Sequence, residues 1–234
     1  MKMKRNGKQN GTKNLIAGTM LLAAFAIWTA MICLIDVQPL GQNGTDIGFA
    51  TLNVWFHQVT GAHMVLYVIT DWLGLIPIFV CMVFGGIGLM QLIKRRSLWK
   101  VDTDIIFLGV YYIIVIIGYL VFEMIPINYR PVLINGIMEV SYPSSTTLLV
   151  LCVMPTLVEQ TSRRVKNKTI NTVTQLLMFA FSAFMVTGRL LSGVHWLTDI
   201  VGAVLLSAGL FCMYKGVVLF GKKVVCEENV TKQI

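Results

Sequence analysis

The chain has 234 residues, of which 56% are hydrophobic and only 13% are charged, and its mean hydropathy is +0.74. This balance excludes an ordinary water-soluble domain, because such domains carry about 25% charged residues. The formal net charge of +8 raises the question of a nucleic-acid partner, which the placement of the basic residues answers below. The composition predicts an integral membrane protein.

Six apolar segments are candidates for membrane-spanning helices, each of which needs about 20 predominantly apolar residues. In chain order they are Leu15–Ile35, Trp72–Ile93, Ile105–Phe122, Thr147–Val158, Val173–Val186 and Trp196–Phe220. The fourth and fifth are short, so flanking polar residues such as Ser144–Thr146 and Thr169–Thr172 must continue these helices inside a protein bundle. The predicted fold class is therefore all-α, a polytopic membrane bundle of six transmembrane helices.

One membrane domain, residues 15–221, is predicted between a basic cytoplasmic tail, residues 1–14, and a second cytoplasmic tail, residues 222–234. The basic leader is also typical of a signal peptide. The apolar run that follows is long and ends without a small-residue cleavage site, so a retained first helix is predicted. Between the first two spans, apolar residues from Phe49 to Val59 recur at near-helical spacing, which predicts an interfacial amphipathic helix, with a packed loop as the alternative.

All but two of the 19 basic residues fall on one side of the six-helix arrangement. Basic residues concentrate in cytoplasmic loops, so this side, with both termini, is predicted to be cytoplasmic. The charge thus reports topology and contact with anionic lipid, and no nucleic-acid partner is predicted. The exceptions, Arg130 and Arg189, lie on the opposite side among several carboxylates. Structural ion pairs are one interpretation of these arginines, and a functional site is the other.

The five cysteines show no paired spacing, and most lie inside apolar runs, where cysteine acts as a small hydrophobic residue. His57 and His63 have no carboxylate or cysteine companions at the spacing of metal ligands, and the sequence shows no metal-ligand cluster. The sequence therefore predicts no disulfide framework, no metal and no other cofactor.

The segment "TGRLLSGVHWLTDIVGA" concentrates polar residues on the extracytoplasmic side. His195 and Asp199 are four residues apart and therefore share one face at the start of the sixth helix. A carboxylate in that position can hold the imidazole and stabilise its cation. Arg189 precedes them across a glycine-containing turn, and its guanidinium can grip an oxyanion with several donors.

The segment "SYPSSTTLL" places Ser144, Ser145 and Thr146 where the fourth helix begins. The first backbone N–H groups of a helix are unpaired and its dipole favours an anion there. Simple N-capping by a hydroxyl group is the alternative interpretation.

Three motifs occur in order on this side of the membrane: "YRP" at Tyr129–Pro131, "PSST" at Pro143–Thr146 and "GRLLSGVHWLTD" at Gly188–Asp199. Together they resemble the signature motifs of the type 2 phosphatidic acid phosphatase superfamily, membrane lipid phosphatases related to vanadium haloperoxidases. The third motif has the arginine, histidine and aspartate at the family spacing. The resemblance covers Glu123–Gly202 directly, and the six-helix topology extends it to most of the chain.

The resemblance implies a role for each matching residue. His195 would attack phosphorus and form a phosphohistidine, with Asp199 hydrogen-bonded to the other ring nitrogen. The groups that would hold the phosphate oxygens are Arg130, Arg189, the Ser144 hydroxyl and the Ser145 amide. Such a reaction depends mainly on positioning and charge stabilisation, and needs no metal in this family.

Three residues depart from the family motifs, namely Gly188 in place of serine, Glu123 in place of lysine and Thr146 in place of the general-acid histidine. A threonine hydroxyl is a poor proton donor, and an alkoxide leaving group needs that proton more than a phosphate with a pKa of about 6. A polyprenyl diphosphate substrate is therefore predicted, or else Glu123 or Glu139 replaces the acid.

The predicted function is hydrolysis of a phospholipid or polyprenyl phosphate head group on the extracytoplasmic side, and the default location is a bacterial plasma membrane. The rival is a degenerate relative that binds lipid phosphates, or assists another membrane protein, without turnover. Transfer of the phosphoryl group to an acceptor other than water is a third interpretation. The oligomeric state is not predicted.

Overall fold

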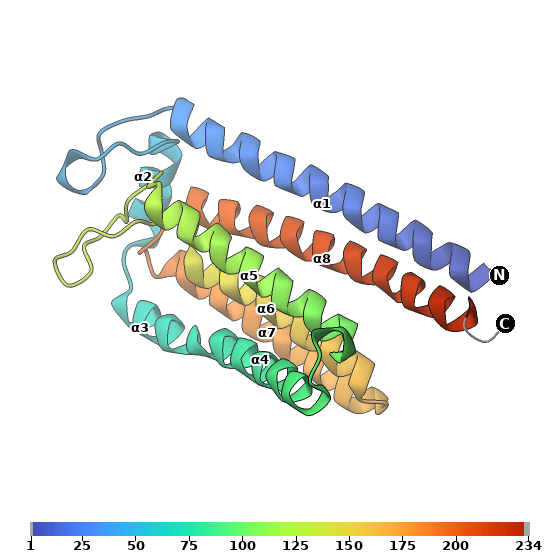
Figure 1. Ribbon diagram of the computed structural model, residues 1–234. Helices are drawn as coiled ribbons and strands as arrows, with labels where there is room; N and C mark the ends of the chain where they lie inside the picture. Colours follow the sequence, from blue (N-terminus) through green and yellow to red (C-terminus); the bar gives the residue numbers. More distant parts are fainter. Residues whose placement is uncertain (1, 232–234) are drawn as a thin grey trace.

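The computed structural model describes residues 2–231, and the side chains of residues 9–220, and these residues form an all-helical protein (Figure 1). The α-helices are α1 (Lys2–Leu34), α2 (Ala50–Thr60), α3 (Met64–Leu73), α4 (Leu75–Arg95), α5 (Thr103–Met124), α6 (Ser145–Arg164), α7 (Lys168–Leu191) and α8 (Leu197–Thr231). Short 3₁₀ turns cover Gln42–Gly44 and Leu98–Lys100. Within this part of the chain β pairing is confined to isolated bridges, which confirms the all-α prediction.

Among the described residues, five helical segments are long and apolar enough to cross a membrane, so the protein is an integral membrane protein. They are Gln9–Leu34, Met64–Arg95, Thr103–Met124, Lys168–Leu191 and Leu197–Phe220. The second of these combines α3 and α4, which meet at Gly74. Five of the six predicted spans are thereby confirmed, and the exception is the predicted segment Thr147–Val158.

That segment belongs to α6, which packs against α4, α5, α7 and α8 inside the bundle. It need not be uniformly apolar, because neighbouring helices satisfy its polar side chains. The hydroxyl groups of Thr156 and Tyr112 are 2.7 Å apart, and Gln160 donates to the Tyr214 hydroxyl at 3.3 Å. Thr156 and Gln160 are therefore buried against protein and do not face lipid.

The long helices α1 and α8 lie side by side (Figure 1). Glycines allow this close approach, since a Cβ at Gly18 would lie 2.8 Å from the side chain of Met213 and one at Gly209 would lie 2.9 Å from that of Leu22. Both helices continue into the predicted tails, because α1 begins at Lys2 and α8 ends at Thr231. Residues 1 and 232–234 of those tails lie outside the described residues.

The three motifs gather at one end of the bundle. The loop between α1 and α2 and the loop between α5 and α6 lie at this end, and the start of α1 and the end of α8 lie at the other (Figure 1). The helix predicted between the first two spans is confirmed as α2, and Asn53 on it donates to the Thr198 hydroxyl at 2.9 Å. This bond fixes α2 to the start of α8, within the third motif.

Candidate active site

The third motif forms the end of α7, a tight turn and the start of α8. Arg189 lies in the last turn of α7 and is 1% exposed, and His195 in the turn is 3% exposed. Gly193 has a φ of +70°, and a Cβ there would lie 2.3 Å from the carbonyl oxygen of Gly61. The turn therefore requires glycine both for its backbone angle and for contact with the segment between α2 and α3.

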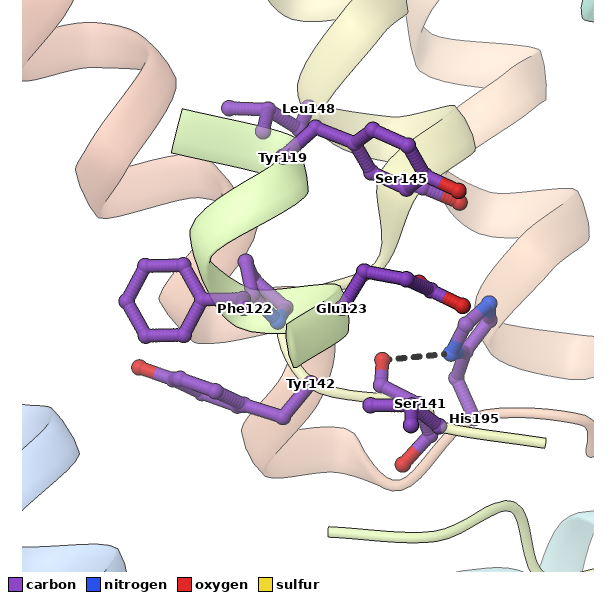
Figure 2. Close-up of a pocket in the computed structure, with 10 residues that line it drawn as sticks. Tyr119, Phe122, Glu123, Ser141, Tyr142, Ser145, Leu148 and His195 are labelled. Carbon is purple, nitrogen blue, oxygen red and sulfur yellow. Dashed lines mark hydrogen bonds between the residues drawn. The ribbon is translucent and has the colours of Figure 1, made fainter. Parts of the chain in front are cut away.

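His195 is oriented by a backbone carbonyl rather than by the predicted carboxylate. Its Nδ1 is 3.1 Å from the carbonyl oxygen of Ser141, the contact drawn in Figure 2, and 3.8 Å from Oδ2 of Asp199. The second distance is too long for a hydrogen bond. Since a carbonyl can only accept, Nδ1 carries the proton and Nε2 carries the free electron pair.

Asp199 uses its carboxylate elsewhere, which explains the missing hydrogen bond. Oδ2 accepts from the backbone N–H of Trp196 at 2.9 Å, and Oδ1 accepts from the side-chain amide of Asn128 at 3.0 Å. The first bond caps α8, and the second ties α8 to the loop of the first motif. The direct His195–Asp199 bond implied by the family resemblance is thus absent, although the carboxylate stays close enough to stabilise a positive imidazole ring.

The first motif holds Arg130 at the edge of the same region. The Arg130 backbone N–H donates to the carbonyl of Glu139 at 3.0 Å, and its Nη2 pairs with the Glu139 carboxylate at 3.0 Å. The indole N–H of Trp196 donates to the carbonyl of Tyr129 at 2.8 Å. The first and third motifs are therefore joined by direct hydrogen bonds.

The second motif forms the start of α6. The hydroxyl at its cap position does not make the N-capping bond that was the alternative interpretation of this motif. Ser144 occupies the cap position of α6, but its side chain makes no capping bond and donates instead to the Thr147 hydroxyl at 3.1 Å. Its backbone N–H points to the carbonyl of Asp199 at 3.3 Å. The next two residues of this motif have different surroundings. Ser145 lines a cavity together with His195, whereas the Thr146 methyl group lies beside Gly74.

Several of the buried polar atoms that have no hydrogen-bond partner lie at the site. Among the described residues they include Nε and Nη1 of Arg130, Nε and Nη1 of Arg189, and Nε2 of His195. Buried donors normally have partners, so these four unpaired nitrogen atoms of two guanidinium groups call for an acceptor that the described part of the chain does not supply. A multivalent oxyanion is such an acceptor. The structure places Arg130 and Arg189 close enough to His195 for their positive charges to act on it.

The cavity beside His195 is drawn in Figure 2. Its polar lining comes from Tyr119 and Glu123 on α5, Ser145 on α6, Ser141 and His195, and the Glu123 side chain extends toward the imidazole. Glu123 replaces a lysine of the family motif. The replacement of lysine by Glu123 therefore puts a carboxyl group into the cavity next to the candidate nucleophile, His195.

Burial, together with the positive charges of Arg189 and Arg130, lowers the pKa of His195 from 6.5 to about 4. The neutral imidazole, the form that can attack, therefore persists in mildly acidic solution. By nitrogen-15 NMR, His195 is expected to stay neutral and protonated on Nδ1 down to about pH 5.5. A midpoint at its ordinary pKa would contradict this result. Between the folded and ordinary values the unfolded chain binds more protons, so folding stability falls as pH falls through that window.

Two residues at the site were not predicted from the sequence: Tyr67 of α3, and Asn128. Asp71, also on α3, is one of the carboxylates that the sequence offers as ion-pair partners of the two arginines. The Tyr67 ring lies next to both arginines, and Asp71 is 3.6 Å from Nη1 of Arg189. The four-residue spacing of Tyr67 and Asp71 is a sequence signal for one helix face. It does not indicate what that face contacts.

Within the described residues, no group of three or more His, Cys, Asp or Glu is arranged to hold a metal ion.

Comparisons with known proteins agree with this arrangement. A chain from the crystal structure of a transmembrane PAP2 type phosphatidylglycerolphosphate phosphatase from Bacillus subtilis superposes with a TM-score of 0.63. The superposition covers 88% of this chain and 96% of that one, at 16% sequence identity, and therefore shows a shared fold. No curated protein sequence matches this chain significantly. The model of the PAP2 superfamily matches residues 106–220, a segment that carries all three motifs, and this match confirms the predicted resemblance of the chain to that superfamily.

Proposed function

We propose that the protein is a membrane lipid phosphatase that transfers a phosphoryl group to His195 and then to water, without a metal. The observation that carries this proposal is the set of unpaired, buried donors of Arg130 and Arg189 beside an unpaired Nε2 of His195. A phosphate group fits that set, because its oxygens accept several hydrogen bonds while its phosphorus meets the nucleophile. The superfamily and the fold of the Bacillus phosphatase support a phosphorylated lipid as the substrate.

The reaction has two steps. Nε2 of His195 forms a bond to phosphorus, the bond to the lipid oxygen breaks, and that oxygen leaves with a proton. The resulting phosphohistidine carries a positive ring, which the Ser141 carbonyl at 3.1 Å and the Asp199 carboxylate at 3.8 Å stabilise. Water then attacks phosphorus, inorganic phosphate leaves, and His195 returns to its neutral form. Both arginines stabilise the charge on the transferring group throughout.

Proton delivery to the leaving oxygen is assigned to Glu123. Glu139, the other carboxyl group considered, is ion-paired with Arg130 at 3.0 Å and is not part of the cavity lining. Glu123 lies in the cavity with His195, where a carboxyl group can give up a proton in the first step and accept one from water in the second.

Substitution Glu123→Gln removes this proton transfer and keeps the side-chain shape. The kcat of this variant for phosphatidic acid, which releases an alkoxide, is expected to fall about 100-fold. This loss is at the low end of the rate enhancement that a general acid provides. A polyprenyl diphosphate releases a weaker base, so its kcat is expected to fall about 10-fold or less. Phosphate release from the two lipids measures both effects, and an equal loss for both would contradict the assigned role.

The active site is assigned to the extracytoplasmic end of the bundle and both termini to the cytoplasm. The start of α1 and the end of α8 lie at the same end of the molecule, opposite the loops that carry the motifs (Figure 1). The basic clusters of the sequence lie in the tails and in the α4–α5 and α6–α7 connections, which the positive-inside rule assigns to the cytoplasm. A bacterial plasma membrane is the proposed location.

The test is phosphate release by the purified protein in detergent, with and without a chelator. Phosphatidylglycerolphosphate, phosphatidic acid and a polyprenyl diphosphate are compared. Release that survives the chelator supports the proposal, and the preferred lipid defines the substrate. Phosphate release that requires an added metal would contradict the metal-free scheme. Binding of these lipids without release would favour the non-catalytic rival, and appearance of the phosphate on another alcohol would favour a phosphotransferase.

A further inference from the structure

The two arginines of the site share one aromatic neighbour. The Cζ atom of Arg189 lies 5.2 Å from the centre of the Tyr67 ring, and that of Arg130 lies 5.8 Å from it. Two guanidinium groups this close to one ring also repel each other. The negative face of an aromatic ring attracts each of them and offsets part of that repulsion.

The helix that carries Tyr67 is fixed to the third motif at both ends. At its start, the backbone N–H of His63 donates to the carbonyl of Ser192 at 2.9 Å. Further along, Thr70 is fully buried, and a Cβ at Gly188 would lie 2.7 Å from its methyl group. The serine usually found in place of Gly188 would thus push α3 away from α7. Gly188 permits α3 and α7 to pack closely, and this packing places Tyr67 beside Arg189.

The carboxylate on the same helix is a weak partner for Arg189. The Asp71 side chain is 58% exposed and lies 3.6 Å from Nη1 of Arg189, beyond hydrogen-bond length. Because the carboxylate of this pair is exposed to solvent and its contact with the buried guanidinium is longer than a hydrogen bond, it contributes little to orientation. Nε and Nη1 of Arg189 have no hydrogen-bond partner among the described residues. The Tyr67 ring is therefore the principal contact available to orient this guanidinium before an anion binds.

We propose that Tyr67 is a positioning residue that holds Arg130 and Arg189 together, with their free N–H groups directed at one phosphate group. The inference rests on the anion site of the proposed function, and it adds α3, which lies outside the three motifs, to the machinery of that site. Tyr67 acts through its ring face and the two arginines, without touching the reacting atoms.

The experiment measures binding of inorganic phosphate to the purified full-length protein by titration calorimetry. Tyr67→Leu removes the ring, and phosphate affinity is expected to fall about 10-fold, the loss of roughly one desolvated cation–π contact. Tyr67→Phe keeps the ring face and is expected to bind within about twofold of the original protein. Trp72→Leu removes an aromatic side chain from the same helix that is 71% exposed, and should leave affinity unchanged. Thermal unfolding verifies that each variant is folded, and Tyr67→Met replaces Tyr67→Leu if the latter does not fold.

Two outcomes would overturn the inference: a ringless variant that binds phosphate as tightly as the original protein, or a Tyr67→Phe variant as weak as Tyr67→Leu. Failure of the unsubstituted protein to bind phosphate would also overturn it. Failure of the proposed function can be distinguished from failure of this inference. If phosphate binding depends on the Tyr67 ring but no lipid is hydrolysed, the positioning role stands without the enzyme. If lipid is hydrolysed and Tyr67→Leu leaves kcat/KM unchanged, the enzyme stands without the positioning role.

Discussion

Substitution His195→Asn is expected to reduce phosphate release from the preferred lipid by about 10⁴-fold or more, which is the scale of removing an enzymatic nucleophile. The asparagine amide occupies the position of Nδ1 and can still donate to the Ser141 carbonyl, which accepts from the ring at 3.1 Å. What is lost is Nε2, the buried atom that has no hydrogen-bond partner among the described residues. The effect should appear in kcat, because phosphate is still held by the arginines.

Lipid-phosphate binding by the same variant provides the control. His195→Asn is expected to bind phosphate within a few-fold of the original protein, since the charged donors that bind it are unchanged. Turnover above about 1% of the original rate in a folded His195→Asn protein would show that another residue accepts the phosphoryl group.

Substitution Arg189→Lys is expected to lower kcat/KM about 100- to 1,000-fold, although it preserves the positive charge. The Arg189 side chain is 1% exposed, and its unpaired Nε and Nη1 form the planar group of donors that a phosphate accepts. A lysine ammonium cannot make the same paired contacts, and it also contacts the Tyr67 ring differently. Both kcat and KM are expected to change, because the guanidinium contacts phosphate in the bound substrate and in the transition state.

Arg164→Lys is the matched control for that substitution. Arg164 lies at the far end of α6, where its Nη2 pairs with Asp104 at 3.0 Å and its side chain is 36% exposed. This arginine is remote from the motifs, so kcat/KM should not change. Arg189→Lys activity within about threefold of the original protein would show that Arg189 is only a structural ion-pair partner of Asp71.

The membrane class and much of the site could be predicted from the sequence because their signals are local. A run of apolar residues indicates a span whatever it later packs against, and the spacing of Arg189, His195 and Asp199 lies within a single segment. Arg130 was identified because the sequence pattern assigns it to the side with few basic residues. These signals need no knowledge of long-range contacts, and the structure brings the residues together as expected.

The remaining features depend on contacts between distant segments. The polar residues of α6, such as Thr156, are accommodated only because α5 supplies a hydroxyl partner. The distance between His195 and Asp199 depends on the hydrogen bonds that Asn128 and Trp196 donate to the Asp199 carboxylate. Tyr67 has no motif at all, and its role follows from the way α3 packs against α7. Neither spacing nor hydropathy carries this information.

Departures from the family motifs illustrate the same limit. The sequence identifies Glu123 as a reversed charge, but only the fold shows that its carboxyl group lies in a cavity with His195. Likewise, Gly188 is a mild change in sequence, whereas in the structure it permits the close contact with Thr70.

The most direct test of the central claim is detection of the phosphohistidine on His195. The purified protein is mixed with its preferred lipid phosphate, quenched within one turnover in base, where a phosphorus–nitrogen bond survives, and analysed by peptide mass spectrometry. The predicted result is one added phosphoryl group on the peptide containing His195, absent in the His195→Asn variant and lost on acid treatment. Turnover with the phosphoryl group on another residue would contradict the account, as would rapid turnover with no phosphorylated peptide at any quench time.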